Sequence, residues 1–335
     1  MLRRLSEAVS VSGNEKEIRA ILKELAAPYG EIRVDAMGNL YVHKKGNGKK
    51  IMACAHMDEV GMMVKGIMED GLLAYAATGI DSRVCVSKRV LVGKNKIPGV
   101  IGSKAIHLQR REDLAKAIPH GELFVDIGAE SREDALKYVN VGDYICFDTE
   151  FSYFGDGKMK GKALDDRIGC AVVLELLKRD YDCDFYGVFT VQEEVGMRGA
   201  MAAAYQVQPE LALIFEGTTA NDMPEAEGHQ HVTKVGGGPA ISMMDSATIV
   251  NPKLFKTMKQ TAEEEGIPYQ VRQGTRGGTD AGAIHKACAG ALAIGISVPC
   301  RYIHGPVSVA AEADYENAVK LADAFLKKRK FDEVK

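Results

Sequence analysis

Apolar runs with strand character alternate with runs of helical periodicity over the second half of the chain. Such an alternation is typical of a mostly parallel or mixed β-sheet covered by helices on both faces. We therefore predict an α/β fold with three αβα layers. The predicted helices are 165–179, 197–205, 252–265, 279–288 and 312–329, and the predicted strands are 184–192, 210–215, 239–244, 267–272 and 291–296.

The first 63 residues fit the same domain. Residues 1–27 have helical periodicity, with Ser12 as a predicted N-cap. Residues 32–42 alternate across a Met-Gly-Asn turn and predict a hairpin. The following strand, 51–55, is apolar on both faces, which is typical of an interior strand in a sheet covered by helices.

Residues 64–156 have a different pattern. Short β-like runs recur at nearly regular spacing and are separated by Gly, Asp, Asn and Pro. This pattern predicts a small β-rich barrel or sandwich, and insertion of such a unit at a loop tip is well tolerated. We therefore predict a discontinuous domain of residues 1–63 and 157–335, with a β-rich domain at 64–156 inserted into it.

Charge and cysteine content exclude several classes of protein. The formal net charge of −3 argues against binding to nucleic acid or to an anionic membrane surface. The N-terminus has no apolar signal-peptide core, and we expect no spanning helix. The seven cysteines are scattered without a C-x-x-C pair, so we expect reduced thiols in a cytoplasmic protein. Cys54 and Cys300, near His56 and His304, leave a thiolate zinc site as an alternative.

Potential metal ligands and bases recur where predicted strands end and at one predicted helix start. Open α/β sheets bind ligands at the carboxyl ends of their strands, so we expect these side chains to meet at one edge. Each has an ordinary explanation when taken singly, for example a helix cap for the Asp165–Asp166 pair. Together they match the inventory of a site for two divalent cations. The residues are His56, Asp165, Glu193, Glu194, Glu216 and His304.

The charges support such a site, because two cations bring +4 and three carboxylates with a bridging hydroxide bring −4. Asp165 is the predicted bridge, with His56 and Glu216 on one ion and Glu194 and His304 on the other. Glu193 is then free to act as the general base. Asp58, in H-x-D, is suited to orient the His56 ring.

Five motifs, in order and spacing, resemble the TET-type metallo-aminopeptidases, the family of glutamyl aminopeptidase and its deblocking relatives in the dizinc peptidase clan MH. They are AHMDEVGMMV, GKALDDRIGC, VQEEVGMRGA, GGTDAG and IHGPVSV. The resemblance implies a zinc-peptidase-like catalytic domain, an inserted barrel used for dimerisation, and a homo-oligomer that is a tetrahedral dodecamer. It also implies two zinc or cobalt ions and the removal of N-terminal residues from short peptides. The family carries His56, Asp165, Glu194 and His304 as ligands and Glu193 as the base, and a cis peptide often joins its two aspartates.

Several alternatives stay open from the sequence. Many relatives place an aspartate where this chain has Glu216, and Asp222 is the fallback ligand. A glycoside hydrolase of the endoglucanase type would use Glu193 and Glu216, but the absence of tryptophan argues against a sugar-stacking cleft. A non-enzymatic peptide-binding protein is a further alternative, against which the complete set of ligands and base argues. The motifs do not indicate which N-terminal residue is preferred or which metal is native.

Overall fold

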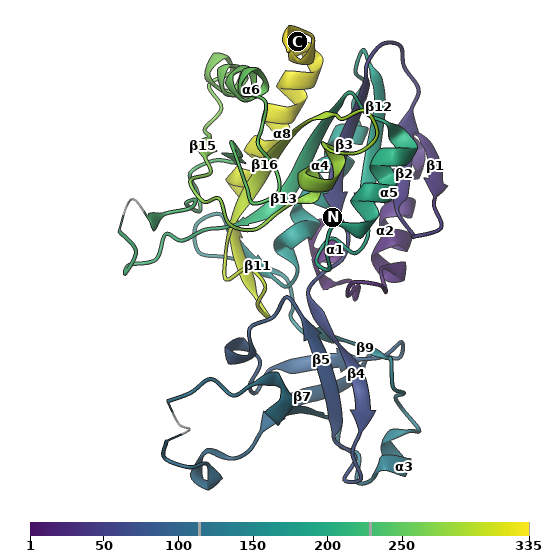
Figure 1. The fold of residues 1–335 in the computed structure, drawn as a ribbon, viewed down its shortest axis with the longest axis vertical. Helices are drawn as coiled ribbons and strands as arrows, with labels where there is room; N and C mark the ends of the chain where they lie inside the picture. Colours follow the sequence, from purple (N-terminus) through teal and green to yellow (C-terminus); the bar gives the residue numbers. More distant parts are fainter. Residues whose placement is uncertain (113–114, 228–229, 335) are drawn as a thin grey trace.

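The computed structural model describes residues 1–112, 115–227 and 230–334. An α/β part and a β-barrel part lie one above the other (Figure 1). The chain passes into the barrel soon after strand β3 (Lys50–His56). The first barrel strand, β4, begins at Gly61. The predicted fold class, an α/β domain with a mixed sheet and a small barrel, is confirmed. The predicted domain limits stay a proposal.

The large sheet has eleven strands, nine of them in the order β1-β2-β12-β3-β13-β16-β17-β11-β10. Its centre is parallel, since β3 pairs in parallel with β12 and β13, and β13 pairs in parallel with β16. The carboxyl ends of these four strands therefore meet at one edge. The other strands are β1 (Glu31–Val34), β2 (Leu40–Lys44), β10 (Ser152–Phe154), β11 (Lys158–Gly161), β12 (Asp184–Thr190), β13 (Leu211–Thr219), β14 (Ala240–Ile241), β15 (Gln270–Val271), β16 (Leu292–Arg301) and β17 (Ser308–Ala311).

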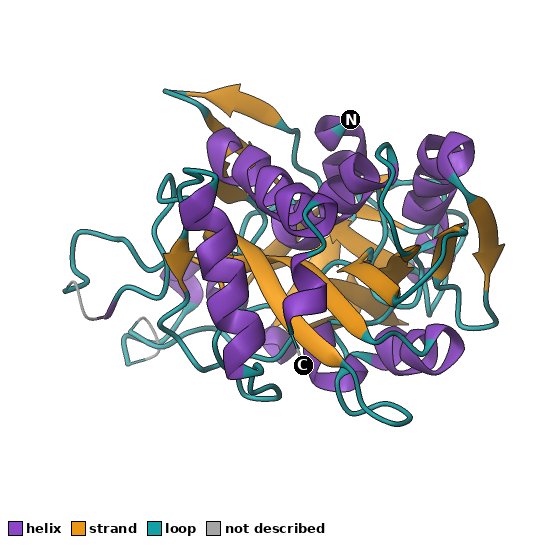
Figure 2. Ribbon diagram, turned by 90° about the horizontal axis from the view of Figure 1, so that it is seen from above, coloured by secondary structure: helices purple, strands orange, loops and turns teal. Residues whose placement is uncertain are grey.

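Helices cover both faces of this sheet (Figure 2). One face of the sheet packs on a large apolar core. Helix α4 lies in this core, and nearly every one of its residues is buried. The opposite face packs on small side chains, mostly alanines, of α5 and α7. On the first face lie α1 (Leu2–Glu7), α2 (Lys16–Ala26), α4 (Leu164–Leu177), α6 (Pro252–Glu264) and α8 (Glu312–Lys327), and on the second lie α5 (Arg198–Val207) and α7 (Asp280–Ile284).

The barrel is closed, with the strand order β4-β5-β8-β7-β6-β9. It has its own apolar core, separate from the two layers of the α/β part. Closure leaves this small sheet without free edges. Its elements are β4 (Gly61–Ile67), β5 (Leu73–Thr78), β6 (Arg89–Val92), β7 (Ile97–Ser103), β8 (Leu123–Asp126), β9 (Tyr144–Phe147) and the short helix α3 (Arg132–Ala135).

Some local predictions were wrong. Ser12 does not cap a helix, because its hydroxyl donates to the Asp58 carboxylate at 2.6 Å and α2 begins only at Lys16. The strands predicted at 239–244 and 267–272 are each only two residues long in the structure, as β14 and β15. No helix in the described part of the chain is long and apolar enough to cross a membrane.

Candidate metal centre and active site

The predicted site residues gather at the edge of the sheet that faces the barrel. His56 is the last residue of β3, and Thr190, the last residue of β12, lies opposite it in the parallel register. The loop that follows β12 therefore starts beside His56 and carries Glu193. Three more residues complete the group: Glu194 in the same loop, Asp165 in the first turn of α4, and His304 in the loop between β16 and β17.

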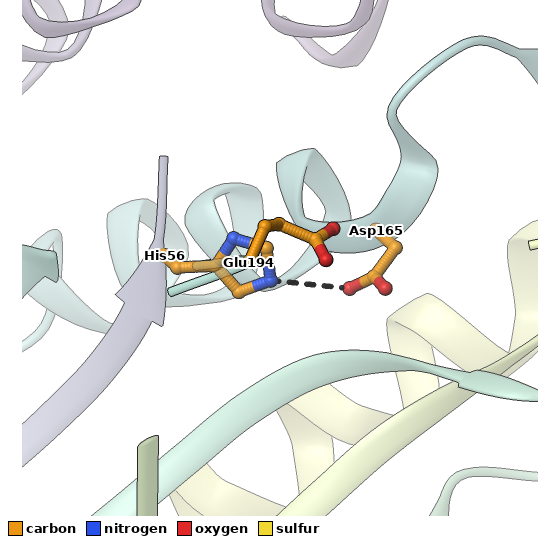
Figure 3. A group of neighbouring side chains, drawn as sticks. All are labelled: His56, Asp165 and Glu194. Carbon is orange, nitrogen blue, oxygen red and sulfur yellow. Dashed lines mark ion pairs between the residues drawn. The ribbon is translucent and has the colours of Figure 1, made fainter. Parts of the chain in front are cut away.

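Asp165 lies between two imidazoles. Its Oδ1 is 3.3 Å from His56 Nε2, and its Oδ2 is 3.5 Å from His304 Nε2. His304 Nε2 is also 3.4 Å from Glu194 Oε2. Figure 3 shows the His56 ring and the Asp165 carboxylate facing each other, with Glu194 beside them. The two oxygens of one carboxylate thus face two different imidazoles.

These separations fit a metal centre better than direct hydrogen bonds. They exceed the roughly 2.7–3.2 Å of an N–H···O bond. A tetrahedral ion with bonds of about 2.0–2.1 Å separates its ligand atoms by about 3.3–3.4 Å. Among the described residues, Asp165 Oδ1 and Glu194 Oε1 are buried without a hydrogen-bond partner. His56, Asp165 and Glu194 each offer a ligand atom within 4.8 Å of the others, so this group is suited to hold a divalent metal ion.

A backbone carbonyl orients each of the two histidines. His56 Nδ1 lies 3.2 Å from the Asp58 carbonyl, and His304 Nδ1 lies 3.1 Å from the Gly79 carbonyl. A carbonyl oxygen only accepts, so Nδ1 of each ring carries the proton. In a neutral ring Nε2 then presents its lone pair to the Asp165 side, as metal-ligating histidines do.

The carboxylate of Asp58 has a wider role than the predicted one. It lies 3.4 Å from His56 Nδ1, but it also accepts hydrogen bonds from the backbone N–H groups of Glu193 at 2.9 Å and Glu194 at 3.2 Å. The side chain is fully buried, and Ser12 donates to it. Asp58 therefore holds the loop that carries both glutamates next to the His56 ring.

Asp166 supports the same region from behind. A cis peptide bond joins Asp165 to Asp166. The Asp166 carboxylate accepts from the backbone N–H of His56 at 3.1 Å and of Gly169 at 2.8 Å. Asp166 thus ties the end of β3 to the start of α4 and does not face the imidazoles.

Burial and mutual repulsion dominate the protonation of the acidic side chains. Burial, with added repulsion from Asp280 and Glu194, raises the pKa of Glu193 to about 9. Burial and the Asp165 charge raise the pKa of Glu194 to about 7. Burial opposes ionisation of Asp165 as well, but the two histidines outweigh it and lower its pKa below the usual value. The site holds more carboxylates than cations, which is the electrostatic signature expected of a cation-binding site.

Glu216 and Asp222 differ sharply in their surroundings. Glu216 lies within β13, and burial followed by the charges of Glu193 and Asp165 raises its pKa well above the usual value. Asp222 accepts two hydrogen bonds from Arg301, each of 2.7 Å, and a third from the backbone of Val235. This pairing commits Asp222 to Arg301, which argues against the fallback assignment of Asp222 as a ligand.

No described cysteine belongs to the candidate metal group, and all seven cysteines are free. Cys54 is buried, and its sulfur lies 3.7 Å from Asp280. The structure therefore gives no support to the alternative of a thiolate zinc site.

A pocket of about 510 Å³ opens beside the centre. It is lined by Asp165, Glu193, Glu194, Glu216 and His304 at one end and by residues that include Arg272 and Arg276 elsewhere. The sequence motifs did not single out these two arginines, although Arg276 stands directly before GGTDAG and Arg272 four residues earlier. The role of Gly79 was also missed, because a backbone carbonyl leaves no side-chain signal.

The model of the M42 glutamyl aminopeptidase family matches residues 38–321. The chain belongs to this family. It is therefore a peptide-bond hydrolase of the aminopeptidase type, as the sequence motifs predicted. This assignment also explains why the motif residues converge on one centre.

Individual relatives of this M42 aminopeptidase match over nearly the whole chain. The TET aminopeptidase structure from Thaumarchaeota archaeon SCGC AB-539-E09 has a TM-score of 0.96 and 36% identity, and the match covers 99% of this chain and 97% of that one. The lysyl aminopeptidase of Pyrococcus furiosus is 32% identical, with 98% and 97% covered. The TET1 peptidase of Pyrococcus horikoshii, which can assemble into a tetrahedron or a large octahedral shell, has a TM-score of 0.87 and 32% identity, with 97% and 98% covered.

Proposed function

We propose that the protein is a dinuclear aminopeptidase that removes N-terminal residues from short peptides. Two divalent ions, zinc or cobalt, would be bridged by Asp165. The observation that carries the proposal is that the two oxygens of Asp165 face two different imidazoles. His56 and Glu216 would hold one ion, and Glu194 and His304 would hold the other.

When bound, two such ions would lower the pKa of a water molecule and polarise the scissile carbonyl. Glu193 would take a proton from the attacking water and deliver it to the leaving amine. Its backbone N–H is fixed by Asp58 at 2.9 Å, which holds the side chain next to the centre. Asp58 thus acts on the reaction by positioning both Glu193 and the His56 ring.

The proposed function is tested by hydrolysis of aminoacyl p-nitroanilides by protein loaded with cobalt or zinc. We expect turnover of free-amine substrates and none of the corresponding N-acetylated ones. Cellulose-derived substrates should release no reducing sugar, which separates this proposal from a glycoside hydrolase. Absence of turnover of every aminoacyl substrate, with metal shown to be bound, would refute it.

The pKa values predict how the metal-free protein responds to pH. A carboxyl group whose pKa is raised in the folded state stabilises the fold below its unfolded pKa, near 4.5 for glutamate, and that contribution is lost as pH rises through the folded value. For Glu194 and Glu193 these folded values are about 7 and about 9. The melting temperature of metal-free protein should therefore fall by roughly 5 °C between about pH 6 and about pH 9.

Added zinc or cobalt should remove most of this decrease in melting temperature with pH. In the metal-free protein, Glu194→Gln should make the decrease smaller. The measurement is differential scanning fluorimetry of chelator-treated protein with and without metal. A melting temperature of the metal-free protein that is constant or rises over this range would contradict the electrostatic account.

The pocket also indicates a preference for acidic N-terminal residues. The Arg272 guanidinium donates to Thr218 at 3.0 Å, to the Arg276 carbonyl at 2.7 Å and to the Gly274 carbonyl. All three partners are neutral. Within the described residues neither Arg272 nor Arg276 pairs with a carboxylate, whereas Asp245, in the same pocket, accepts two backbone N–H bonds of 2.7 Å. The two guanidinium charges at this part of the pocket are thus available to pair with a ligand. We propose that this part of the pocket receives a glutamyl or aspartyl side chain.

Arg276→Ala should lower kcat/KM for glutamyl p-nitroanilide about fivefold, which corresponds to about 1 kcal/mol for a solvent-exposed charge contact. The alanyl substrate, which has no side-chain charge, should change less than about twofold. Arg276→Lys, which keeps the charge, is the matched control and should retain most of the glutamyl activity. An equal loss on both substrates, or a wild-type preference for lysyl substrates, would contradict the acidic assignment.

We also propose that the chain forms a homo-oligomer of dimers joined through the barrel, in the form of a tetrahedral dodecamer. The assembly of the TET1 relative supports this proposal. The barrel also exposes large apolar side chains of the kind that subunit contacts cover. They include Ile106, Leu108, Tyr138 and Val141, which are 72%, 60%, 50% and 60% exposed.

A further inference from the structure

The two candidate histidine ligands are supported in different ways. His56 is only 2% exposed, and its ring is oriented by the Asp58 carbonyl two residues further along the chain. The His304 side chain is 41% exposed and lies in a loop. Its Nδ1 makes the 3.1 Å contact to the Gly79 carbonyl, and its Nε2 faces Asp165 and Glu194 at 3.5 and 3.4 Å. The Nδ1 side of the His304 ring is therefore held by a residue that belongs to the other part of the molecule.

Gly79 is held firmly by the barrel. It follows Thr78, the last residue of β5, which pairs with Gly61 of β4. The next residue, Ile80, packs in the barrel core, and its carbonyl accepts a 2.9 Å hydrogen bond from His120 Nε2. The position of the Gly79 carbonyl is thus fixed from both sides by barrel contacts.

A residue larger than glycine would be strained at this position. Gly79 has φ +70°, in the left-handed region that favours glycine. A Cβ atom here would lie 2.6 Å from Val60 Cγ1 and 3.6 Å from His304 Nδ1. A larger residue would therefore have to displace the Val60 side chain or shift the backbone next to the carbonyl that His304 uses.

We propose that the inserted barrel is part of the metal centre, with Gly79 as a positioning residue whose carbonyl holds His304 Nε2 toward Asp165 and Glu194. The inference rests on the proposed dinuclear function. The affinity of Glu194 and His304 for their metal ion then depends on the barrel. The ion held by His56 is supported within the α/β part alone.

The test is titration of metal-free protein with cobalt, followed by calorimetry and by the cobalt absorption spectrum. Gly79→Ala should bind one cobalt ion per chain as wild type does and bind the second roughly 10–100-fold more weakly, the usual loss when the hydrogen-bond partner of a ligand is disturbed. Gly128→Ala is the matched control, because Gly128 also has a positive φ, +78°, in the barrel but nothing within 4 Å of the added Cβ. It should lose only the stability that the strained φ costs and keep both ions.

A second variant leaves Gly79 untouched. His120→Ala removes the hydrogen bond to the Ile80 carbonyl and should weaken the same ion by a smaller factor. Two cobalt ions bound with wild-type affinity by both Gly79→Ala and His120→Ala would overturn the role of the barrel while leaving the aminopeptidase proposal intact. A wild-type protein that binds fewer than two ions would instead refute the dinuclear function, and this inference with it.

Discussion

Asp165→Asn is expected to abolish binding of both metal ions as a unit, with a loss of hydrolysis of at least about 10³-fold. One carboxylate faces both imidazoles, at 3.3 and 3.5 Å. Two divalent ions roughly 3.5–4 Å apart depend on a bridging negative charge to offset their repulsion. An amide oxygen is neutral, and the amide nitrogen on the other side is not a ligand.

The measurement for this variant is metal content by mass spectrometry after gel filtration, together with hydrolysis of the best substrate. Asp156→Asn, in an exposed turn, is the matched control and should behave as wild type. Two bound ions with full activity in Asp165→Asn would show that Asp165 is not the bridge.

Glu193→Gln should leave the metal centre intact and lower kcat by about 10²–10⁴-fold, the range supplied by a positioned general base. The glutamine keeps the shape of the side chain but accepts no proton. The backbone N–H bond from Glu193 to Asp58 does not involve the altered group, so the loop should stay in place.

Glu194→Gln, one residue further on, gives the contrasting result. Its carboxylate is a proposed ligand 3.4 Å from His304 Nε2, so its loss should reduce metal content as well as kcat. Equal kcat for Glu193→Gln and wild type, with both ions bound, would exclude Glu193 as the base.

Residues whose role depends on strand ends could be placed from the sequence. His56, Glu193 and His304 follow strands whose carboxyl ends meet at one edge, and a parallel register brings them together whatever the details of the loops. The fold class followed from the alternation of strand-like and helical runs along the chain. Asp165 was placed by its position at the start of an apolar helix, which the structure shows as buried α4.

Pairings between distant parts of the chain could not be predicted. Asp222 lies 79 residues from Arg301, and no local pattern indicates their ion pair. The bonds from Asp58 to the backbone of Glu193 and Glu194 depend on the conformation of a loop, which side-chain type does not determine. Gly79 acts through its carbonyl, so only the three-dimensional arrangement shows that it contacts His304.

The central claim is that hydrolysis depends on two divalent ions bridged by Asp165. It is tested most directly by adding cobalt stepwise to chelator-treated wild-type protein while bound metal and p-nitroanilide hydrolysis are measured in the same samples. We expect no hydrolysis without metal, two ions bound per chain at saturation, and full activity only when both are bound. Full activity in the metal-free protein, or saturation at a single ion with full activity, would contradict the account.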